Sequence, residues 1–219
     1  MAAPSVRSMH RLWGRVPLLY VLCEYVAFGG SPSAIRQTAV DRLRVRPGAH
    51  VLEIGCGTGR NFRYILDAIG PTGHLVGVDY SADMLATAQR ICRTHGWDNV
   101  KLIHGDAART TEAVDVGSFD AVLFVLALNG LTEPRRALRN ASAALRPGGH
   151  CVVCDKQPFT GWARTLNPPV GFVMRRLLGW RSDLQVSDEL CAVFGNVESE
   201  ERALGSIEVA TARREPTAA

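Results

Sequence analysis

The apolar residues of this chain follow two alternating spacings, which predict strands and helices in turn. Short, nearly continuous apolar runs predict buried strands at residues 50–54, 75–79, 100–104, 121–126 and 151–155. After the first run, apolar residues recur at helical spacing and predict a helix whose buried face carries Phe62, Ile65, Leu66 and Ile69. Strands that alternate with helices in this way are typical of a parallel, doubly wound sheet with helices on both faces.

Capping and turn residues predict where further helices begin and end. Ser81 can cap a helix N-terminus, and the helix that it predicts has an apolar face made of Met84, Ala88, Ile91 and Cys92. Residues 132–134, Thr-Glu-Pro, predict the start of another helix that ends at Leu145. We expect residues 146–149, Arg-Pro-Gly-Gly, to turn the chain into the fifth strand.

The alternation of strands and helices stops after the fifth strand. Proline and glycine punctuate residues 156–185, which predict an insertion, and a short helix is expected at about 186–194. The last segments predict two strands with a turn between them, at 197–201 and 206–213. This ending predicts an α/β fold with three layers and a mostly parallel seven-stranded sheet with one antiparallel C-terminal strand.

The N-terminal residues 1–46 predict a helical cap that precedes a sheet domain of residues 47–215. Two helices are expected, at 8–28 and 32–44. The first is similar to a signal peptide, but Glu24 interrupts its apolar run, which is too short to cross a bilayer. We therefore expect an amphipathic helix of a cytoplasmic protein, with peripheral contact to a membrane as the alternative.

Composition limits the class of protein without identifying its partner. A chain of 219 residues with 47% hydrophobic and 21% charged residues matches one globular domain, and a net charge of +4 is too small to indicate nucleic acid. Seven arginines in residues 1–46 favour an anionic substrate or surface, or simply form a solvated helix face. The six cysteines lie at apolar positions and predict reduced thiols. Cys151 and Cys154 would point to opposite faces of a strand, so no metal site is expected.

The residues after the first strand carry the clearest chemistry. Glu53 is followed by Gly55, Gly57 and Gly59 at the junction of a strand and a helix. Glycine allows a tight bend and a close approach of a ligand to the backbone. A dinucleotide-binding loop would have its last glycine one position later, where this chain has Arg60. The spacing therefore favours a ligand with an amino-acid tail over a ligand with a pyrophosphate. Glu53 can accept a hydrogen bond from the ammonium group of such a tail.

Two more acidic residues follow the second and third strands. Asp79 lies 20 residues after Gly59, where a carboxylate can accept hydrogen bonds from both hydroxyl groups of a ribose. Asp106 follows the third strand at the same edge of the sheet and can accept from an adenine amino group. The glycine loop and the two acids together predict a site for an adenosine-containing ligand.

Residues 45–155 resemble the class I S-adenosylmethionine-dependent methyltransferase family, especially its ubiquinone/menaquinone-biosynthesis and phospholipid N-methyltransferase-like branch. The resemblance rests on the segments VLEIGCGTGRN, VDYSADML, HGDA, FDAVLFVLAL and LRPGGH. It implies a Rossmann-like fold, a methyl-transfer reaction, and S-adenosylmethionine as the cofactor without a metal. The cofactor-binding residues that it implies are Glu53, Gly55, Gly57, Thr58, Gly59, Asn61, Asp79, Tyr80, Met84, Asp106, Ala107 and Phe124.

The resemblance also implies which part of the cofactor each residue contacts. The glycine loop and Glu53 would hold the methionine end, and the backbone carbonyl of Phe124 would lie near its ammonium group. Asp79 would hold the ribose. The adenine ring would lie between Tyr80 and Met84, with Asp106 and Ala107 at its edge.

The methyl acceptor is less well defined by the sequence. Many enzymes that methylate nucleic acid or protein carry an Asn/Asp-Pro-Pro-Tyr motif after the fourth strand, where this chain has Ala-Leu-Asn-Gly, so no nucleic-acid partner is expected. Apolar residues with interleaved arginines favour a small hydrophobic or amphiphilic acceptor, such as a lipid, quinone or secondary metabolite, although they would also suit a homodimer surface. The acceptor-side candidates, each of which can equally be a packing residue, are Tyr20, Tyr25, Asn129 and Asp155.

Three other functions stay open at this point. The same fold can hold the cofactor without transferring its methyl group and act as a pericyclase or cyclase scaffold. RNA or protein methylation is a second option, but no RNA-binding module or basic-aromatic stripe is visible. The early position of Gly59 and the C-terminal hairpin argue against the third, an NAD-dependent oxidoreductase.

Overall fold

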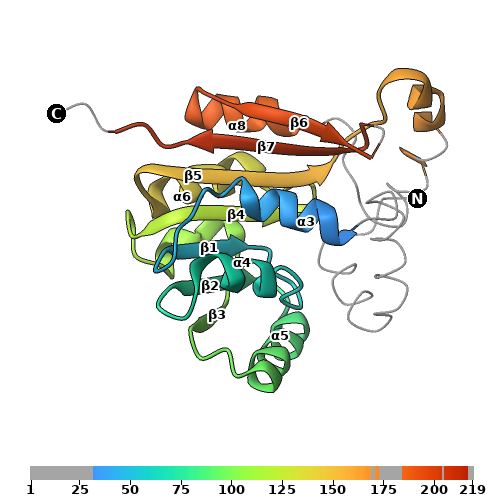
Figure 1. Cartoon of the computed structure of the whole chain (residues 1–219). Helices are drawn as coiled ribbons and strands as arrows, with labels where there is room; N and C mark the ends of the chain where they lie inside the picture. Colours follow the sequence, from blue (N-terminus) through green and yellow to red (C-terminus); the bar gives the residue numbers. More distant parts are fainter. Residues whose placement is uncertain (1–31, 169–170, 173–183, 204, 217–219) are drawn as a thin grey trace.

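The predicted strands form one seven-stranded sheet in a computed structural model that describes residues 32–168, 171–172, 184–203 and 205–216. The strands are β1 His50–Ile54, β2 His74–Asp79, β3 Val100–His104, β4 Phe119–Val125, β5 Leu145–Lys156, β6 Glu198–Arg202 and β7 Ile207–Arg213. Their order across the sheet is β3-β2-β1-β4-β5-β7-β6 (Figure 1). The strands from β1 to β5 are parallel, and β7 runs antiparallel to both of its neighbours. The prediction of a mostly parallel sheet with one antiparallel strand is confirmed.

Helices cover both faces of this sheet. The described helices are α3 Pro32–Asp41, α4 Phe62–Ile69, α5 Ala82–His95, α6 Pro134–Ala144 and α8 Val186–Phe194, with short 3-10 turns at η1 Ala107–Glu112, η2 Leu128–Gly130 and η3 Gly161–Leu166. The buried residues of α3, α4 and α5 belong to one hydrophobic core, and those of η1, α6 and α8 belong to the core on the opposite face. The fold is therefore the predicted three-layer α/β sandwich.

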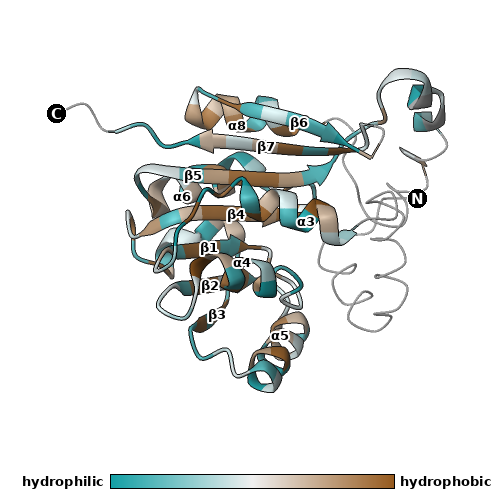
Figure 2. Ribbon diagram, in the orientation of Figure 1, coloured by the Kyte–Doolittle hydropathy of each residue, from teal (hydrophilic) through white to brown (hydrophobic). Residues whose placement is uncertain are grey.

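The central strands are apolar on both faces because each face lies under a helical layer (Figure 2). The edge strand β6 is different, since its sequence Glu-Ser-Glu-Glu-Arg is mostly exposed and charged. Charge on an edge strand discourages pairing with the sheet of another molecule. Along β5, Cys151 lies in one core and Cys154 in the other, as the alternation of side chains predicted.

Two details of the sequence-based expectations are corrected. The turn expected at residues 146–149 is part of a longer β5, which begins at Leu145. The register slips between Phe119, which lies opposite Leu145, and Ala121, which lies opposite His150, so the extra residues bulge without ending the strand. In α5 the buried residues are Leu85, Ala88 and Cys92, whereas Met84 and Ile91, which were also expected on this face, are half-buried. Met84 lies in the first turn of α5, and its backbone N–H donates a hydrogen bond to the side chain of Ser81, which caps the helix N-terminus.

The helical cap predicted for residues 1–46 is described only from residue 32 onward. The predicted helix at 32–44 corresponds to α3, whose Ile35, Ala39 and Val40 are buried against the sheet. The helix expected at 8–28 and much of the insertion expected at 156–185 lie outside the described residues. Among the residues that are described, no helix is long and apolar enough to span a membrane.

Truncation of Leu123 in the middle of β4 should destabilise the protein. Its side chain has no exposed surface, and a leucine-to-alanine change at such a site leaves a cavity that costs about 2–5 kcal/mol. We expect Leu123→Ala to lower the free energy of unfolding in urea by that amount. The control is Val116→Ala, a truncation at a side chain that is 62% exposed. Equal losses in the two variants would contradict the position of Leu123 in the core.

Candidate functional site

The predicted acidic residues lie together at the carboxyl edge of the parallel strands. Glu53 lies near the end of β1, Asp79 ends β2, and Asp106 follows β3. Because β1 pairs with β2 and β2 with β3, the three strand ends are consecutive along this edge. Ligands of doubly wound sheets bind outside the carboxyl ends of the strands. The three predicted acidic residues therefore lie at the edge where a ligand site is expected.

The glycine loop between β1 and α4 requires glycine for two distinct reasons. Gly55, Gly57 and Gly59 have φ angles of 74°, 55° and 80°, in the left-handed region that other residues rarely adopt. A Cβ on Gly55 would lie 2.5 Å from the Cβ of Ala127, so this glycine allows close packing. A Cβ on Gly57 would meet no atom within 4 Å, so the backbone there has an open face that a ligand can approach. Thr58, half-buried, lies between the second and third glycines.

Asp79 connects this loop to the end of β2. Its Oδ2 accepts a hydrogen bond from the Gly57 N–H at 2.8 Å, and its Oδ1 accepts one from the Ser81 N–H at 2.8 Å. The side chain is only 6% exposed. Each carboxylate oxygen has a second lone pair, so Asp79 can hold the loop and still accept hydrogen bonds from a ligand.

Glu53 belongs to a buried polar chain that begins on α3. Arg36 donates to Asn61 Oδ1, and Asn61 Nδ2 donates to Glu53 Oε1 at 2.5 Å. All three side chains are buried, and the other oxygen of Glu53, Oε2, has no hydrogen-bond partner in the described part of the chain. Burial raises the pKa of Glu53 to about 8, although the Asn61 hydrogen bond and the Arg36 charge oppose the rise. The structure thus presents an acidic oxygen that can take one more donor.

Arg36 is a site residue that the sequence analysis did not single out. It lies one helical turn before Val40 on the buried side of α3. An arginine at the spacing of a buried stripe indicates a buried partner, and that spacing could have identified it. The partner itself, Asn61, lies 25 residues away in the sequence and could not be predicted from local pattern.

The end of β3 and the start of α5 bring the predicted adenine-binding residues to this edge. Asp106 is exposed, and its Oδ1 accepts from the Ala108 N–H at 2.9 Å, while Ala107 is buried. Tyr80 is 43% exposed, and its ring centroid lies 6.2 Å from that of His104. Together with the half-buried Met84, these residues offer apolar surface beside an acidic acceptor.

The ends of β4 and β5 bring two acceptor-side candidates into direct contact. The Asn129 N–H donates to Asp155 Oδ2 at 2.9 Å, and Asn129 Nδ2 donates to the Lys156 carbonyl at 2.7 Å. The amide oxygen of Asn129 is buried and has no partner among the described residues. Burial raises the pKa of Asp155, which the N–H groups of Asn129 and Lys156 partly offset. This pair therefore places a buried carboxyl group and a buried amide group at the same edge of the sheet as the predicted cofactor-binding residues.

Leu126 turns the chain between these two groups of residues. Its φ of 53° is unusual for a residue with a branched side chain, and such strain persists only where the surrounding structure fixes it. The turn places Ala127 against Gly55 and leads into η2, which carries Asn129. Phe124, two residues earlier, is fully buried in the sheet, so any contact of this residue with a ligand would have to come from its backbone.

The other predicted site residues have different outcomes. Tyr20 and Tyr25 lie outside the described residues. Within the described ranges, no group of three or more His, Cys, Asp and Glu side chains could hold a metal ion.

Comparison with known proteins gives a consistent picture. A family model described as a methyltransferase domain matches residues 46–202. A demethylmenaquinone methyltransferase of Listeria welshimeri is 30% identical over 141 residues, which cover 64% of this chain and 59% of that protein. The match therefore spans less than two thirds of the length of this relative.

Solved structures are similar in fold at low sequence identity. A SAM dependent methyltransferase from Aquifex aeolicus has a TM-score of 0.63 and 14% identity, with 82% of this chain and 89% of that chain covered. The cyclase SpnF has a TM-score of 0.71 and 18% identity, with 99% of this chain and 98% of that chain covered. At these identities the likeness concerns the fold alone.

The raised pKa of Glu53 predicts how the stability of the protein depends on pH. The folded protein keeps a proton on Glu53 up to about pH 8, whereas the ordinary pKa of a glutamate side chain is 4.5. Between these values the folded state binds more protons than the unfolded state, so the free energy of unfolding falls as pH rises, by at most about 1.4 kcal/mol per pH unit. Glu53→Gln, which has no proton to lose, should remove this contribution.

Urea unfolding of both proteins at several pH values between about 5 and 8 tests this expectation. Other ionisable groups are shared, so they cancel in the difference between the two curves. We expect the glutamine variant to gain stability relative to the wild type as pH rises. A difference that does not change with pH would show that Glu53 ionises normally in the folded state.

Proposed function

We propose that this chain, which belongs to the class I S-adenosylmethionine-dependent methyltransferase family, transfers a methyl group from S-adenosylmethionine to a small, quinone-like acceptor. The family model covers most of the chain, and the fold is that of such enzymes. The acceptor class is suggested by the name of the curated relatives, which are demethylmenaquinone methyltransferases. The observation that carries the proposal is the junction in which Asp79 holds the Gly57 N–H beside an open glycine face.

The residues at this junction fit the cofactor on two observations. Glu53 Oε2 is buried without a partner in the described part of the chain, so an ammonium group beside it would satisfy it. The open face of Gly57 leaves room for a ligand at the backbone. In the proposed arrangement, Glu53 and residues 55–59 hold the methionine end, and Asn61 keeps Glu53 in place. Asp79 accepts from the ribose.

The remaining predicted contacts complete the proposed cofactor site. Tyr80 and Met84 would flank the adenine ring, and Asp106 and Ala107 would contact its edge. The backbone carbonyl of Phe124 would face the ammonium group. When bound, S-adenosylmethionine supplies a methyl group that is already activated by its sulfonium charge.

The acceptor side of the proposed site is built on Asn129 and Asp155. The unpartnered amide oxygen of Asn129 can accept a hydrogen bond from a hydroxyl group of the acceptor. Asp155 holds the Asn129 N–H, which fixes that amide oxygen in position. If the acceptor arrives protonated, the raised pKa of Asp155 suits it to receive the proton. The protein otherwise has to align the acceptor with the methyl group and exclude water.

Exposed apolar side chains support an amphiphilic acceptor. Trp162 on η3 is 75% exposed and Phe172 is 73% exposed, and both belong to the segment between β5 and α8. Large aromatic side chains exposed close together along a chain favour contact with an apolar molecule or a membrane surface. We propose that Trp162 and Phe172 contact the apolar part of the acceptor as it enters the site and allow peripheral contact with the membrane where such acceptors reside.

A second candidate function is a cyclase that uses the fold and the cofactor without methyl transfer. The similarity in fold to the cyclase SpnF supports this second candidate. The two functions differ in one product, because only methyl transfer yields S-adenosylhomocysteine. Accumulation of S-adenosylhomocysteine that depends on the added acceptor would exclude the cyclase alternative.

Loss of the Asp79 carboxylate should abolish tight binding of the cofactor. Charge-assisted hydrogen bonds to ribose hydroxyl groups contribute enough that Asp79→Ala should weaken S-adenosylhomocysteine binding by at least about tenfold. Calorimetry with purified protein measures this. Asp83→Ala, which removes an exposed carboxylate in the first turn of α5, is the matched control and should bind as the wild type does. Unchanged binding by Asp79→Ala, or a preference for NAD, would refute the proposed site.

Truncation of Asn129 should impair use of the acceptor more than binding of the cofactor. We expect Asn129→Ala to raise the KM for demethylmenaquinone about five- to tenfold, because one hydrogen bond to the acceptor is lost. The dissociation constant of S-adenosylhomocysteine should stay unchanged. Asn196→Ala removes an amide near the opposite end of the sheet, where Asn196 accepts from the Arg213 N–H, and should change neither value. Parallel losses in acceptor use and cofactor binding would mean that Asn129 has a structural role only.

A further inference from the structure

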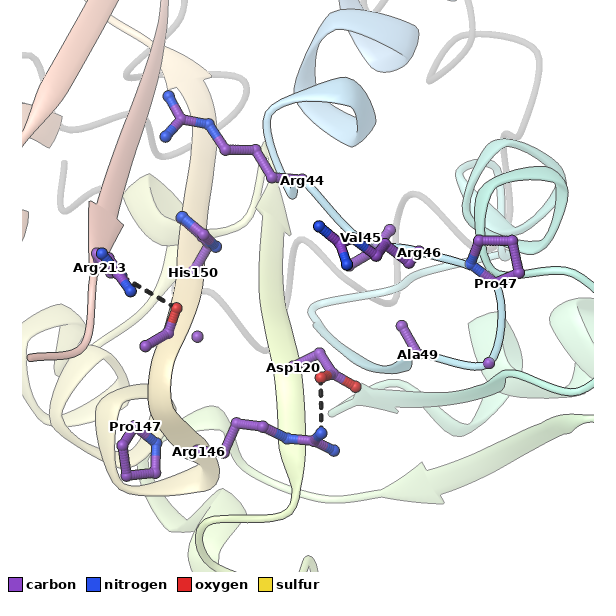
Figure 3. A pocket seen from close by; sticks show the side chains of 13 residues that line it. Arg44, Val45, Arg46, Pro47, Ala49, Asp120, Arg146, Pro147, His150 and Arg213 are labelled. Atoms are coloured by element: carbon purple, nitrogen blue, oxygen red, sulfur yellow. Dashed lines mark hydrogen bonds and ion pairs between the residues drawn. The ribbon is translucent and has the colours of Figure 1, made fainter. Parts of the chain in front are cut away.

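A hollow lies at the amino edge of the parallel strands, at the opposite end of β1 from the glycine loop (Figure 3). Its volume is about 470 Å³. Four segments line it: the linker between α3 and β1, the start of β4, the bulged start of β5, and the end of β7. The cofactor and acceptor residues discussed above are not among its lining residues.

The lining of this cavity has more positive than negative charge. Four arginines line it, Arg44, Arg46, Arg146 and Arg213, and Asp120 is the one acidic residue among its lining residues. Asp120 pairs with Arg146 at 2.8 Å, and Glu198, outside the lining, pairs with Arg44 at 2.8 Å. These two ion pairs account for two of the four guanidinium groups.

The other two guanidinium groups have no carboxylate partner in the part of the chain that the structure describes. Arg213 Nε donates to the neutral Gly148 carbonyl at 3.3 Å, and no hydrogen bond or ion pair of the Arg46 side chain occurs among those residues. Figure 3 shows these side chains on separate walls of the hollow. Two uncompensated positive charges that face one cavity favour an anion between them.

The walls that carry these charges are held in place by the backbone. Asp120 Oδ2 accepts from the His50 N–H at 2.7 Å and so fixes the start of β4 to the start of β1. Gly148 and Gly149 exchange backbone hydrogen bonds of 2.8 and 2.9 Å with Arg214. A site whose walls are fixed loses little conformational entropy when a ligand binds.

The pKa of His150, which lines the cavity, responds to the positive charges around it. Burial lowers its pKa, and the charges of Arg44 and Arg213 lower it further, whereas Glu198 acts in the opposite direction. Near neutral pH the imidazole is therefore uncharged and can donate a hydrogen bond without adding to the repulsion between the arginines.

We propose that this cavity binds the phosphate group of a small anionic ligand. The planar guanidinium group matches two oxygens of a phosphate at once, which makes arginine the preferred residue for such recognition. The cavity is larger than one phosphate group requires, so it can accept a diphosphate or a phosphate with an attached headgroup. The same chemistry would come from a free phosphate compound or from an anionic lipid headgroup, and the experiment separates the two.

The first arm of the test is calorimetric titration of the full chain with inorganic pyrophosphate at constant ionic strength. We expect saturable binding that raises the Tm of the protein. Arg46→Ala should weaken this binding about tenfold, and the double variant Arg46→Ala, Arg213→Ala should weaken it further. Both arginines are exposed, so the variants should fold, and unchanged binding of S-adenosylhomocysteine checks this. Arg90→Ala, an exposed arginine on α5, is the matched control.

The second arm uses vesicles of phosphatidylcholine with and without phosphatidic acid. Binding only to the acidic vesicles that is lost in the double variant identifies a lipid headgroup as the source of the phosphate. Saturable pyrophosphate binding without vesicle binding identifies a free phosphate compound. Pyrophosphate binding that is equal in the wild type and the double variant, or the absence of saturable binding to either probe, would overturn the proposal.

Discussion

The hydrogen bond from the Gly57 N–H to Asp79 Oδ2 is the contact on which the geometry of the proposed cofactor site depends. It joins the loop after β1 to the end of β2, while the other oxygen of Asp79 holds the Ser81 N–H at the start of α5. One buried carboxylate thus positions a loop, a strand end and a helix start. The loop can reach it because Gly57 adopts a left-handed conformation, in which a residue with a side chain would be strained and would fill the open face.

A second constraint is the cost of burying the carboxyl group of Glu53. A carboxylate without exposed surface is unfavourable unless it is paired, and here the nearest positive charge comes from α3 through Asn61. The helix before β1 therefore contributes electrostatically to the site as well as to the core. A protonated Glu53 is neutral in the free protein, and a cationic ligand beside it would favour loss of that proton. In the proposed arrangement, cofactor affinity and the ionisation of this one group are consequently linked.

The sequence predicts the parts of the structure that local chemistry decides. Buried strands are recognised because they are apolar on both faces. The glycines in residues 55–59 predict a left-handed backbone conformation, because glycine adopts it without strain. The sequence does not predict contacts that tertiary pairing decides. The start of β5 depends on its register against β4, and the Arg36–Asn61 contact joins residues 25 positions apart. The contact between Asn129 and Asp155, which the sequence named only as separate candidates, follows a turn at Leu126, whose backbone conformation leucine seldom adopts.

The two edges of the sheet carry opposite charge. Asp79 and Asp106 lie at the carboxyl edge, whereas Arg46 and Arg213, which have no carboxylate partner among the described residues, lie at the amino edge. A strand of five residues such as β1 is about 17 Å long, so the two edges are separated by roughly twice the Debye length at physiological ionic strength. The field of one edge therefore has little effect on a ligand at the other. Any coupling between a cation at the glycine loop and an anion in the cavity lined by Arg46 and Arg213 would therefore have to pass through the packed strands between them, because closely packed interiors transmit strain.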